Sequence, residues 1–196
     1  MGAVTVHEGF TDCERDRVAA LYWEAFGRKL RPAFADETTG RATVRAALRG
    51  DRFLVARQEG HVLGVCGFRQ DGTAASDLGW SRLRGTLSIA ASLRASLVLS
   101  ILARSDAPGA LVLDGICVDP AARGGGVGTL LLAAAVEKAK RAGAQVVRLS
   151  VIDANPRARA LYERRGFRAI GDGTLGPLAL VYGFDRYTTM ERKVTQ

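Results

Sequence analysis

The feature that most constrains the fold is a glycine-rich turn that lies between two apolar segments. Residues 110–118 (ALVLDGICV) have the composition of a strand, residues 123–128 (RGGGVG) form the turn, and residues 129–141 are expected to form a helix. Glycines let a ligand approach the backbone closely, and the first N–H groups of a helix lack partners within it. Because the helix dipole is positive at this end, the turn is expected to bind a phosphate or pyrophosphate.

Two common phosphate loops do not fit the spacing of these glycines. ATP and GTP loops end in Gly-Lys-Ser/Thr, whereas Gly128 is followed directly by Thr129. A dinucleotide fingerprint needs GxGxxG, and its third glycine is missing whether the count starts at Gly124 or at Gly126. The sequence therefore disfavours ATP, GTP, NAD and FAD, and it leaves a ligand-free structural corner as the alternative.

The turn is the first of two motifs that resemble those of the GCN5-related N-acetyltransferases, the GNAT family. RxxGxG at residues 123–128 resembles the Q/R-x-x-G-x-G/A signature of that family, and residues 116–120 (ICVDP) are similar to its preceding strand. Further along, NxxAxxxYxxxGF at residues 155–167 is similar to the second conserved block of the family. Two motifs in the family's order and separation indicate an acetyltransferase, most specifically over residues 110–171.

The resemblance implies an α/β (α+β) GNAT fold, with a mixed central sheet of six to seven strands flanked by helices. It implies one acetyltransferase domain over residues 1–196, and the sequence pattern agrees with this architecture. Helices are expected at residues 12–26, 43–49, 129–141 and 156–165, with a loop at 27–39. Strands are expected at residues 3–8, 52–58, 61–69, 110–118, 145–151, 167–170 and 187–194.

An inserted apolar helical segment near residues 76–107 departs from the minimal family pattern, in which the hairpin leads directly to the fourth strand. Its centre, residues 83–104, has Arg94 in the middle, which makes a membrane span costly. Ser88, Ser92, Ser96 and Ser100 recur every four residues and form one stripe of small side chains on a helix. We expect this helix to pack in the core or to form a homodimer, rather than to act as a lid over a pocket.

The resemblance implies that acetyl-CoA is the acyl donor and that no metal takes part. In this family the backbone of the fourth strand binds the pantetheine arm, and the amides of the glycine-rich turn bind the pyrophosphate. An asparagine at the start of the later helix contacts the arm, although here it can equally serve as a helix cap. The residues expected to bind acetyl-CoA are Ile116, Cys117, Val118, Arg123, Gly124, Gly125, Gly126, Val127, Gly128, Thr129, Asn155 and Tyr162.

The same resemblance implies that Tyr162 protonates the departing CoA thiolate; a core tyrosine is the alternative. Relatives that acetylate protein N-termini carry a Glu base on the fifth strand, where this chain has Ser150 by alignment. Asp114 is the first substitute, Glu24 is the second, and a water chain is the third. An amine of pKa near 10 loses its proton at a cost of about 4 kcal/mol at pH 7. We expect direct attack in a ternary complex, with Cys117 as an inert buried thiol.

Composition and charge agree with an anionic ligand. Lys and Arg number 28 against 20 acidic residues, so the formal net charge is +8. The Arg-rich segment at residues 157–168 can neutralise CoA phosphates, and no nucleic-acid motif accompanies it, so neither a nucleic-acid nor a membrane partner is expected. The three cysteines form no CxxC, which indicates neither a metal site nor a disulfide framework and fits a cytoplasmic protein.

The predicted function is transfer of an acetyl group from acetyl-CoA to an amine. A small amine or antibiotic is favoured over a protein N-terminus as acceptor, because residue 150 is not Glu; a peptide amine stays open. The alternative is a catalytically weak sensor or regulatory module that binds acetyl-CoA, and the presence of both Tyr162 and Asn155 favours the enzyme.

Overall fold

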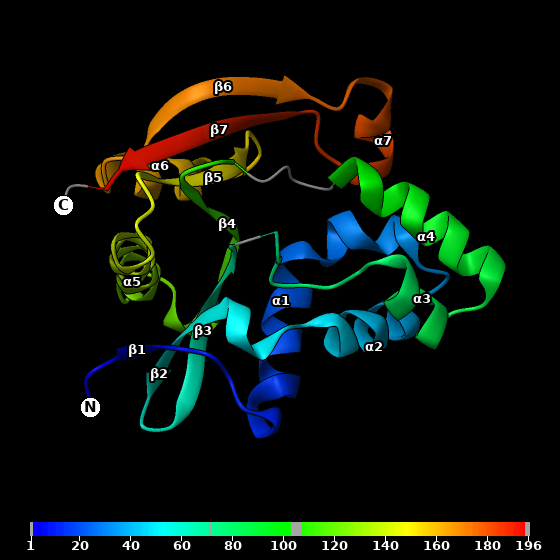
Figure 1. Ribbon diagram of the computed structural model, residues 1–196, viewed down its shortest axis with the longest axis horizontal. Coiled ribbons are helices and arrows are strands. Elements are labelled where there is room, and N and C mark those ends of the chain that lie inside the picture. The colour runs from blue at the N-terminus through cyan, green and yellow to red at the C-terminus, as the bar shows by residue number, and fades with distance from the viewer. Residues whose placement is uncertain (1, 71, 103–106, 195–196) are drawn as a thin grey trace.

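The computed structural model describes residues 2–70, 72–102 and 107–194, which form one mixed seven-stranded sheet (Figure 1). The strand order is β1-β2-β3-β4-β5-β7-β6, and β4 and β5 make its single parallel pair. This confirms the expected mixed sheet of six to seven strands. The strands are β1 (Thr5–Glu8), β2 (Phe53–Gln58), β3 (His61–Arg69), β4 (Ala110–Val118), β5 (Val146–Ile152), β6 (Arg168–Thr174) and β7 (Arg186–Lys193).

Helices cover both faces of this sheet. On one side lie α1 (Arg15–Leu30), α2 (Glu37–Ala47), α3 (Trp80–Thr86) and α4 (Ile89–Leu102). On the other side lie α5 (Val127–Arg141) and α6 (Pro156–Arg164), and the short α7 (Ala179–Tyr182) connects β6 to β7 near the end of α4 (Figure 1).

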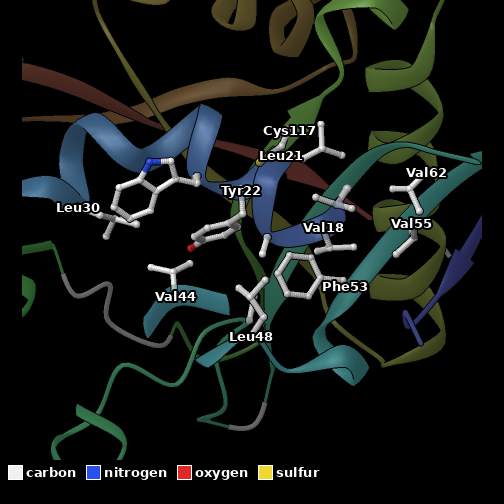
Figure 2. Close-up of a cluster of buried hydrophobic side chains, with 14 of the residues drawn as sticks. Val18, Leu21, Tyr22, Leu30, Val44, Leu48, Phe53, Val55, Val62 and Cys117 are labelled. Atoms are coloured by element: carbon white, nitrogen blue, oxygen red, sulfur yellow. The ribbon is translucent and has the colours of Figure 1, made fainter. Parts of the chain in front are cut away.

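Each face of the sheet has its own layer of buried side chains, because successive residues of a strand point to opposite faces. In β2, Phe53 and Val55 face α1, whereas Leu54 and Ala56 face α5. Figure 2 shows the first layer, in which Phe53 and Val55 pack near Val18 of α1. Full burial of a Val, Leu or Phe side chain contributes about 1.5–3 kcal/mol, so the two layers fix the helices to the sheet.

The first two helices are longer than the sequence pattern predicted. The predicted loop at residues 27–39 is wrong over most of its length, because α1 continues to Leu30 and a 3-10 turn, Arg31–Ala33, follows directly. Pro32 is tolerated there because it lies in the first turn, where its missing N–H has no helical partner to lose. α2 then begins at Glu37, capped by Asp36, which accepts the N–H of Thr39 at 2.8 Å.

The apolar segment near residues 76–107 forms two helices instead of the single one expected over residues 83–104. The chain is extended at Leu87, between α3 and α4, and the hydroxyl of Ser88 accepts the N–H of Ala91 at 3.3 Å. Of the serine stripe, Ser92 is fully buried beside Ala95, so α4 does pack against the core. The end of the expected helix, residues 103–104, lies outside the described residues, and the status of the segment as an insertion in the family stays a prediction.

The outward face of α4 carries large apolar side chains. Ile89, Leu93 and Leu97 recur every four residues and are 60%, 59% and 70% exposed. Ser92, Ala95, Val98 and Leu99 pack toward the core, so α4 carries apolar side chains on both its inner and its outer face. Among the described residues, none of the helices combines the length and the apolar character that crossing a membrane requires.

Candidate active site

β4 and β5 pair at one end only. Their backbone partners run from Ala110–Val146 to Val112–Arg148, and beyond this point β4 continues to Val118 with β3 as its paired neighbour. Some of the N–H and C=O groups of residues 114–118 therefore point toward β5 without a strand partner there. A ligand that contains amide groups can pair with this edge as a short added strand.

Asp114 lies in a β-bulge of β4. Consecutive residues of β3 pair with residues 113 and 115, so Asp114 is the extra residue of the strand. The bulge turns Asp114 and Gly115 to the same side: the Asp114 carboxylate accepts the N–H of Ala75 at 2.9 Å, and a Cβ at Gly115 would lie 2.0 Å from the ring of Phe26 in α1. The carboxylate is therefore held on the face of the sheet that α1 covers.

The glycine-rich turn joins the free edge of β4 to α5. Gly124 and Gly126 have φ values of 87° and 83°, a region that favours glycine, and Gly126 is the residue before the helix. A Cβ at Gly124 or at Gly126 would meet no atom within 4 Å, so open space faces this backbone. No side chain of the described residues caps the first amides of α5. The turn thus has the free N–H groups and the space that a pyrophosphate needs.

Arg123 closes the turn against α1. Its Nε donates to the carbonyl oxygen of Val118 at 3.1 Å, and its Nη2 donates to Glu24 at 2.9 Å. The side chain of Glu24, the second candidate base, is therefore held in an exposed ion pair beside the turn. This contact suggests a structural role for Glu24 in positioning Arg123.

The second motif places two predicted residues on α6. The side chain of Asn155 accepts the N–H of Ala158 at 3.1 Å, which confirms its role as a helix cap. Tyr162 is buried, with 9% of its surface exposed, and its ring lies 6.0 Å from that of Phe167 within the core layer on the α5 side. Asn155 and Tyr162 thus lie on the face of the sheet opposite to Asp114.

A cavity of about 1050 Å³ lies on the α1 side of the sheet. The floor of the cavity includes Val112 and Asp114 of β4 and Arg148 and Ser150 of β5. The walls are formed by α1, by the loop after β3 and by the segment between β6 and β7. Of the three predicted catalytic residues, Asp114 lines this cavity, whereas Glu24 and Tyr162 lie outside it. The part of β4 that is not paired with β5 lies between this cavity and the core layer on the α5 side, which holds Tyr162.

α4 is one of the walls of this cavity. Ser96, Leu99 and Ser100 line it, and the hydroxyl of Tyr182 in α7 donates to the carbonyl oxygen of Val98 at 2.6 Å. Two residues of the serine stripe therefore face the cavity, whereas the sequence favours packing or dimerisation over a place beside a pocket. The structure shows α4 in two roles, packing and enclosure of the cavity.

The thiols of Cys66 and Cys117 are not activated as nucleophiles. Cys66 and Cys117 are buried, and burial raises the pKa of both thiols far above the ordinary value, so neither forms a thiolate at neutral pH. Cys117 therefore lacks the activation that a covalent acetyl-cysteine intermediate needs. An amine that attacks the thioester directly avoids this requirement.

The described geometry can be compared with known proteins. The family model named "Acetyltransferase (GNAT) family" matches residues 15–167, which include the edge of β4, the glycine-rich turn and Tyr162. The chain belongs to the GNAT family. The match confirms the resemblance to the GNAT family, and this family uses acetyl-CoA as a substrate. No curated protein sequence matches the chain at a significant level.

Solved structures share this GNAT fold at low sequence identity. One, titled as an acetyltransferase, has a TM-score of 0.64 and 22% identity, over 97% of this chain and 100% of the other. A GCN5-related N-acetyltransferase from Kribbella flavida has a TM-score of 0.63 and 20% identity, over 97% and 98%. The ribosomal-protein-S18-alanine N-acetyltransferase from Escherichia coli has a TM-score of 0.55 and 16% identity, over 99% and 96%. These likenesses confirm the predicted GNAT fold.

Sequence reasoning missed the basic side chains that line the GNAT cavity. Arg69 and Arg148 come from strands that are distant in sequence, and their partner strands place them on the same face as Val112. The available signal was the alternation of β5, where Arg148 and Ser150 interrupt an otherwise apolar strand on one face.

Proposed function

We propose that this GNAT protein transfers the acetyl group of acetyl-CoA to an amine by direct attack in a ternary complex. The observation that carries the proposal is the unpaired edge of β4, which runs from Asp114 in the cavity to the glycine-rich turn before α5. A cofactor laid along this edge would have its pyrophosphate at the helix start and its thioester near Asp114.

The cofactor contacts follow from this direction. The amides of Gly124 and of residues 126–129 would bind the pyrophosphate, since the N–H of Gly125 already donates to the carbonyl oxygen of Ala122 at 3.3 Å. The backbone of Ile116, Cys117 and Val118 would pair with the pantetheine amides. Arg123 would orient the turn through its bonds to Val118 and Glu24. The exposed arginines that follow Asn155 would neutralise phosphate charge, so we propose no nucleic-acid partner.

Asp114 would act as the base. In the reaction, Asp114 accepts a proton from the ammonium group, and the free amine attacks the thioester carbonyl carbon. Its bond to the N–H of Ala75 holds one carboxylate oxygen, which leaves the other oxygen for the acceptor. A positioned base typically contributes 10²- to 10⁴-fold to the rate.

Tyr162 would act as the acid. When the tetrahedral intermediate collapses, the C–S bond breaks, and the hydroxyl of Tyr162 donates its proton to the CoA sulfur. The nitrogen, which still carries one extra proton after the attack, releases it to solvent, and the tyrosinate regains a proton from solvent. Because a thiolate is already a reasonable leaving group, the contribution of the acid is expected to be smaller than that of the base. Acid and base would approach the thioester from opposite faces of the sheet, which keeps the two proton transfers apart.

A thiol-release assay distinguishes an acetyltransferase from a protein that only binds acetyl-CoA. Purified protein is incubated with acetyl-CoA and a panel of amines, and the release of free CoA thiol is followed. The enzyme releases thiol only when an amine is present. A sensor or regulatory module that binds acetyl-CoA would give calorimetric binding without amine-dependent thiol release.

The domain extent, the cellular location and the partners of the protein are also proposals. We propose one acetyltransferase domain over residues 1–196 that works in the cytoplasm, without a metal or a membrane partner, on a small amine in preference to a protein N-terminus. A homodimer through α4 stays a prediction, and the exposed stripe of Ile89, Leu93 and Leu97 is the face that a second copy would cover.

A further inference from the structure

The cavity has a cationic floor beside its candidate base. Arg69 of β3 pairs with Val112 of β4, which pairs with Arg148 of β5, and directly paired residues point to the same face. The two arginines therefore flank Val112 in one row, and both line the cavity. Among the described residues, four basic ones line it, Lys29, Arg49, Arg69 and Arg148, against two acidic ones, Asp77 and Asp114.

Arg148 uses one edge of its guanidinium in its contacts with Glu191. Its Nε donates to Glu191 at 2.5 Å, and its Nη2 forms an ion pair with the same carboxylate oxygen. Both contacts lie on one edge of the guanidinium, so Nη1 makes no hydrogen bond to the described residues. Glu191 thus orients the group without occupying all of its donors, and the planar fork of arginine suits a carboxylate or phosphonate.

Asp114 lies one row further along the sheet. It follows Val112 by two residues on β4 and lies on the same face, and Arg148 is the last residue of β5 that pairs with β4. On the neighbouring strands, Ser150 of β5 pairs with Thr189 of β7, and their hydroxyl oxygens lie 3.5 Å apart. The other acidic side chain, Asp77, accepts the N–H of Gly79 at 3.2 Å at the start of α3. Asp114 is therefore the carboxylate next to the cationic row.

We propose that the acceptor is a primary amine that also carries an anionic group, a carboxylate or a phosphonate, within the same small molecule. Its ammonium group contacts Asp114 and its anion contacts Arg148, with Arg69 adding positive charge on the other side of Val112. This inference rests on the proposed acetyltransferase function and names its substrate class.

The remainder of the cavity suits an apolar body on that molecule. Aromatic side chains from α1, α3, β7 and the segment before β7 also line the cavity. Lys29 lies 4.7 Å from the centroid of the Phe184 ring, so an aromatic contact already accompanies its charge. The aromatic lining residues are Tyr22, Phe26, Trp80, Phe184 and Tyr187.

Matched amines test the anionic group directly. The probes are L-phenylalanine with L-phenylalaninamide, and the other natural amino acids with their amides, assayed with acetyl-CoA by thiol release. An aminoalkyl phosphonate with the corresponding alkylamine distinguishes phosphonate from carboxylate recognition. We expect kcat/KM to be about 10- to 100-fold higher for the anionic member of the preferred pair, the range expected for one hydrogen bond to a charged group.

Variants of the cationic row separate recognition from folding. Arg148→Gln is expected to lower kcat/KM for the anionic acceptor by about 10- to 100-fold and to leave the value for its uncharged partner unchanged. Because this change leaves Glu191 without its ion pair, the double variant Arg148→Gln with Glu191→Gln removes both charges together. Arg148→Lys is expected to restore part of the loss. Arg45→Gln, which removes an arginine paired with Asp16 outside the cavity, is the matched control.

The outcomes are distinct. Equal or faster turnover of the uncharged amines overturns the inference, and so does a protein that binds acetyl-CoA but acetylates none of the anionic amines. An equal loss with Arg148→Gln for both members of a pair also overturns it, because that loss would indicate a structural effect. Failure to bind acetyl-CoA would instead overturn the proposed function itself.

Discussion

The carboxylate of Asp114 accepts the backbone N–H of Ala75 at 2.9 Å, which ties the bulge of β4 to the loop between β3 and α3. Asp114 lines the cavity at this bulge, and the hydrogen bond fixes the direction of its carboxylate. A base on a loop-anchored bulge is held more rigidly than one on a free surface, which suits proton abstraction at a defined point.

Asp114→Asn tests this role with little structural change. The amide oxygen of Asn can still accept the N–H of Ala75, but the neutral side chain cannot take a proton from an ammonium group. We expect kcat/KM at pH 7 to fall by about 10²-fold or more, with a smaller loss at high pH, where the free amine is already present.

Two matched variants complete this experiment. Asp77→Asn removes the other cavity carboxylate and should leave most of the activity. Glu24→Gln breaks the exposed ion pair with Arg123 and should cost less than about 1 kcal/mol of stability. Full activity in Asp114→Asn together with a large loss in Glu24→Gln would transfer the role of base to Glu24.

Tyr162→Phe tests the acid. Phenylalanine keeps the ring that packs near Phe167 and removes the hydroxyl, so the fold should persist. Because the thiolate is a reasonable leaving group, we expect kcat to fall by about 10- to 100-fold, toward the low end for a general acid. Single-turnover thiol release measures this step, and an unchanged rate would leave Tyr162 as a core residue only.

Gly126→Ala tests the glycine-rich turn. Its φ of 83° places a Cβ in the left-handed region, at a cost of about 1–2 kcal/mol, even though open space faces the residue. We expect lower stability in denaturant unfolding together with weaker acetyl-CoA binding. Gly85→Ala in α3 is the control, because Gly85 has an ordinary helical backbone and an added Cβ meets no atom within 4 Å. Equal stability of the two variants would contradict the account.

Acid stability should depend on Glu14. Hydrogen bonds from Arg57, at 2.6 and 2.9 Å, lower the pKa of Glu14 from 4.5 to about 2. Since the folded pKa is below the unfolded one, the stabilisation is complete above about pH 4.5 and is lost as the pH falls toward 2. Glu14→Gln should therefore flatten the acid limb of the unfolding curve, whereas Glu163→Gln on α6 should not.

The thiols give a simple check on the direct mechanism. Cys13 is exposed, whereas Cys66 and Cys117 are buried with raised pKa values. A thiol reagent should therefore label one cysteine in the folded protein and three after unfolding. Cys117→Ala should retain acetyl transfer within a few-fold; complete loss of turnover in a folded Cys117→Ala protein would favour a covalent intermediate.

Local signals in the sequence predicted the glycine-rich turn and the cap of α6 well, whereas the cap of α2 at Asp36 was missed. The glycines at residues 124–128 and the cap at Asn155 depend on neighbours within a few residues, and both have the expected geometry. The end of α1 was missed because Pro32 and the polar residues around it indicated a loop that begins at Gly27. In the structure Gly27 is a helical position against which the Trp23 ring packs, where a Cβ would lie 2.9 Å from the indole nitrogen. Tertiary packing explains that glycine, and no local pattern reveals it.

The cavity could not be predicted because it depends on strand register. The bulge that turns Gly115 to the same face as Asp114, and the row that joins Arg69 to Arg148, arise from pairing between segments that are about 40 residues apart in the chain. The alternation within one strand predicts which of its residues share a face of the sheet. It does not predict the register, that is, which residues of the neighbouring strand lie beside them.

The most direct test of the central claim is calorimetric titration of the purified protein with acetyl-CoA, with CoA and NADH titrated in parallel. The account predicts binding of acetyl-CoA and of CoA in the micromolar range, no binding of NADH, and weaker binding of both CoA species to Gly126→Ala. Absence of acetyl-CoA binding by the folded protein would contradict the account, and the glycine-rich turn would then be a structural corner.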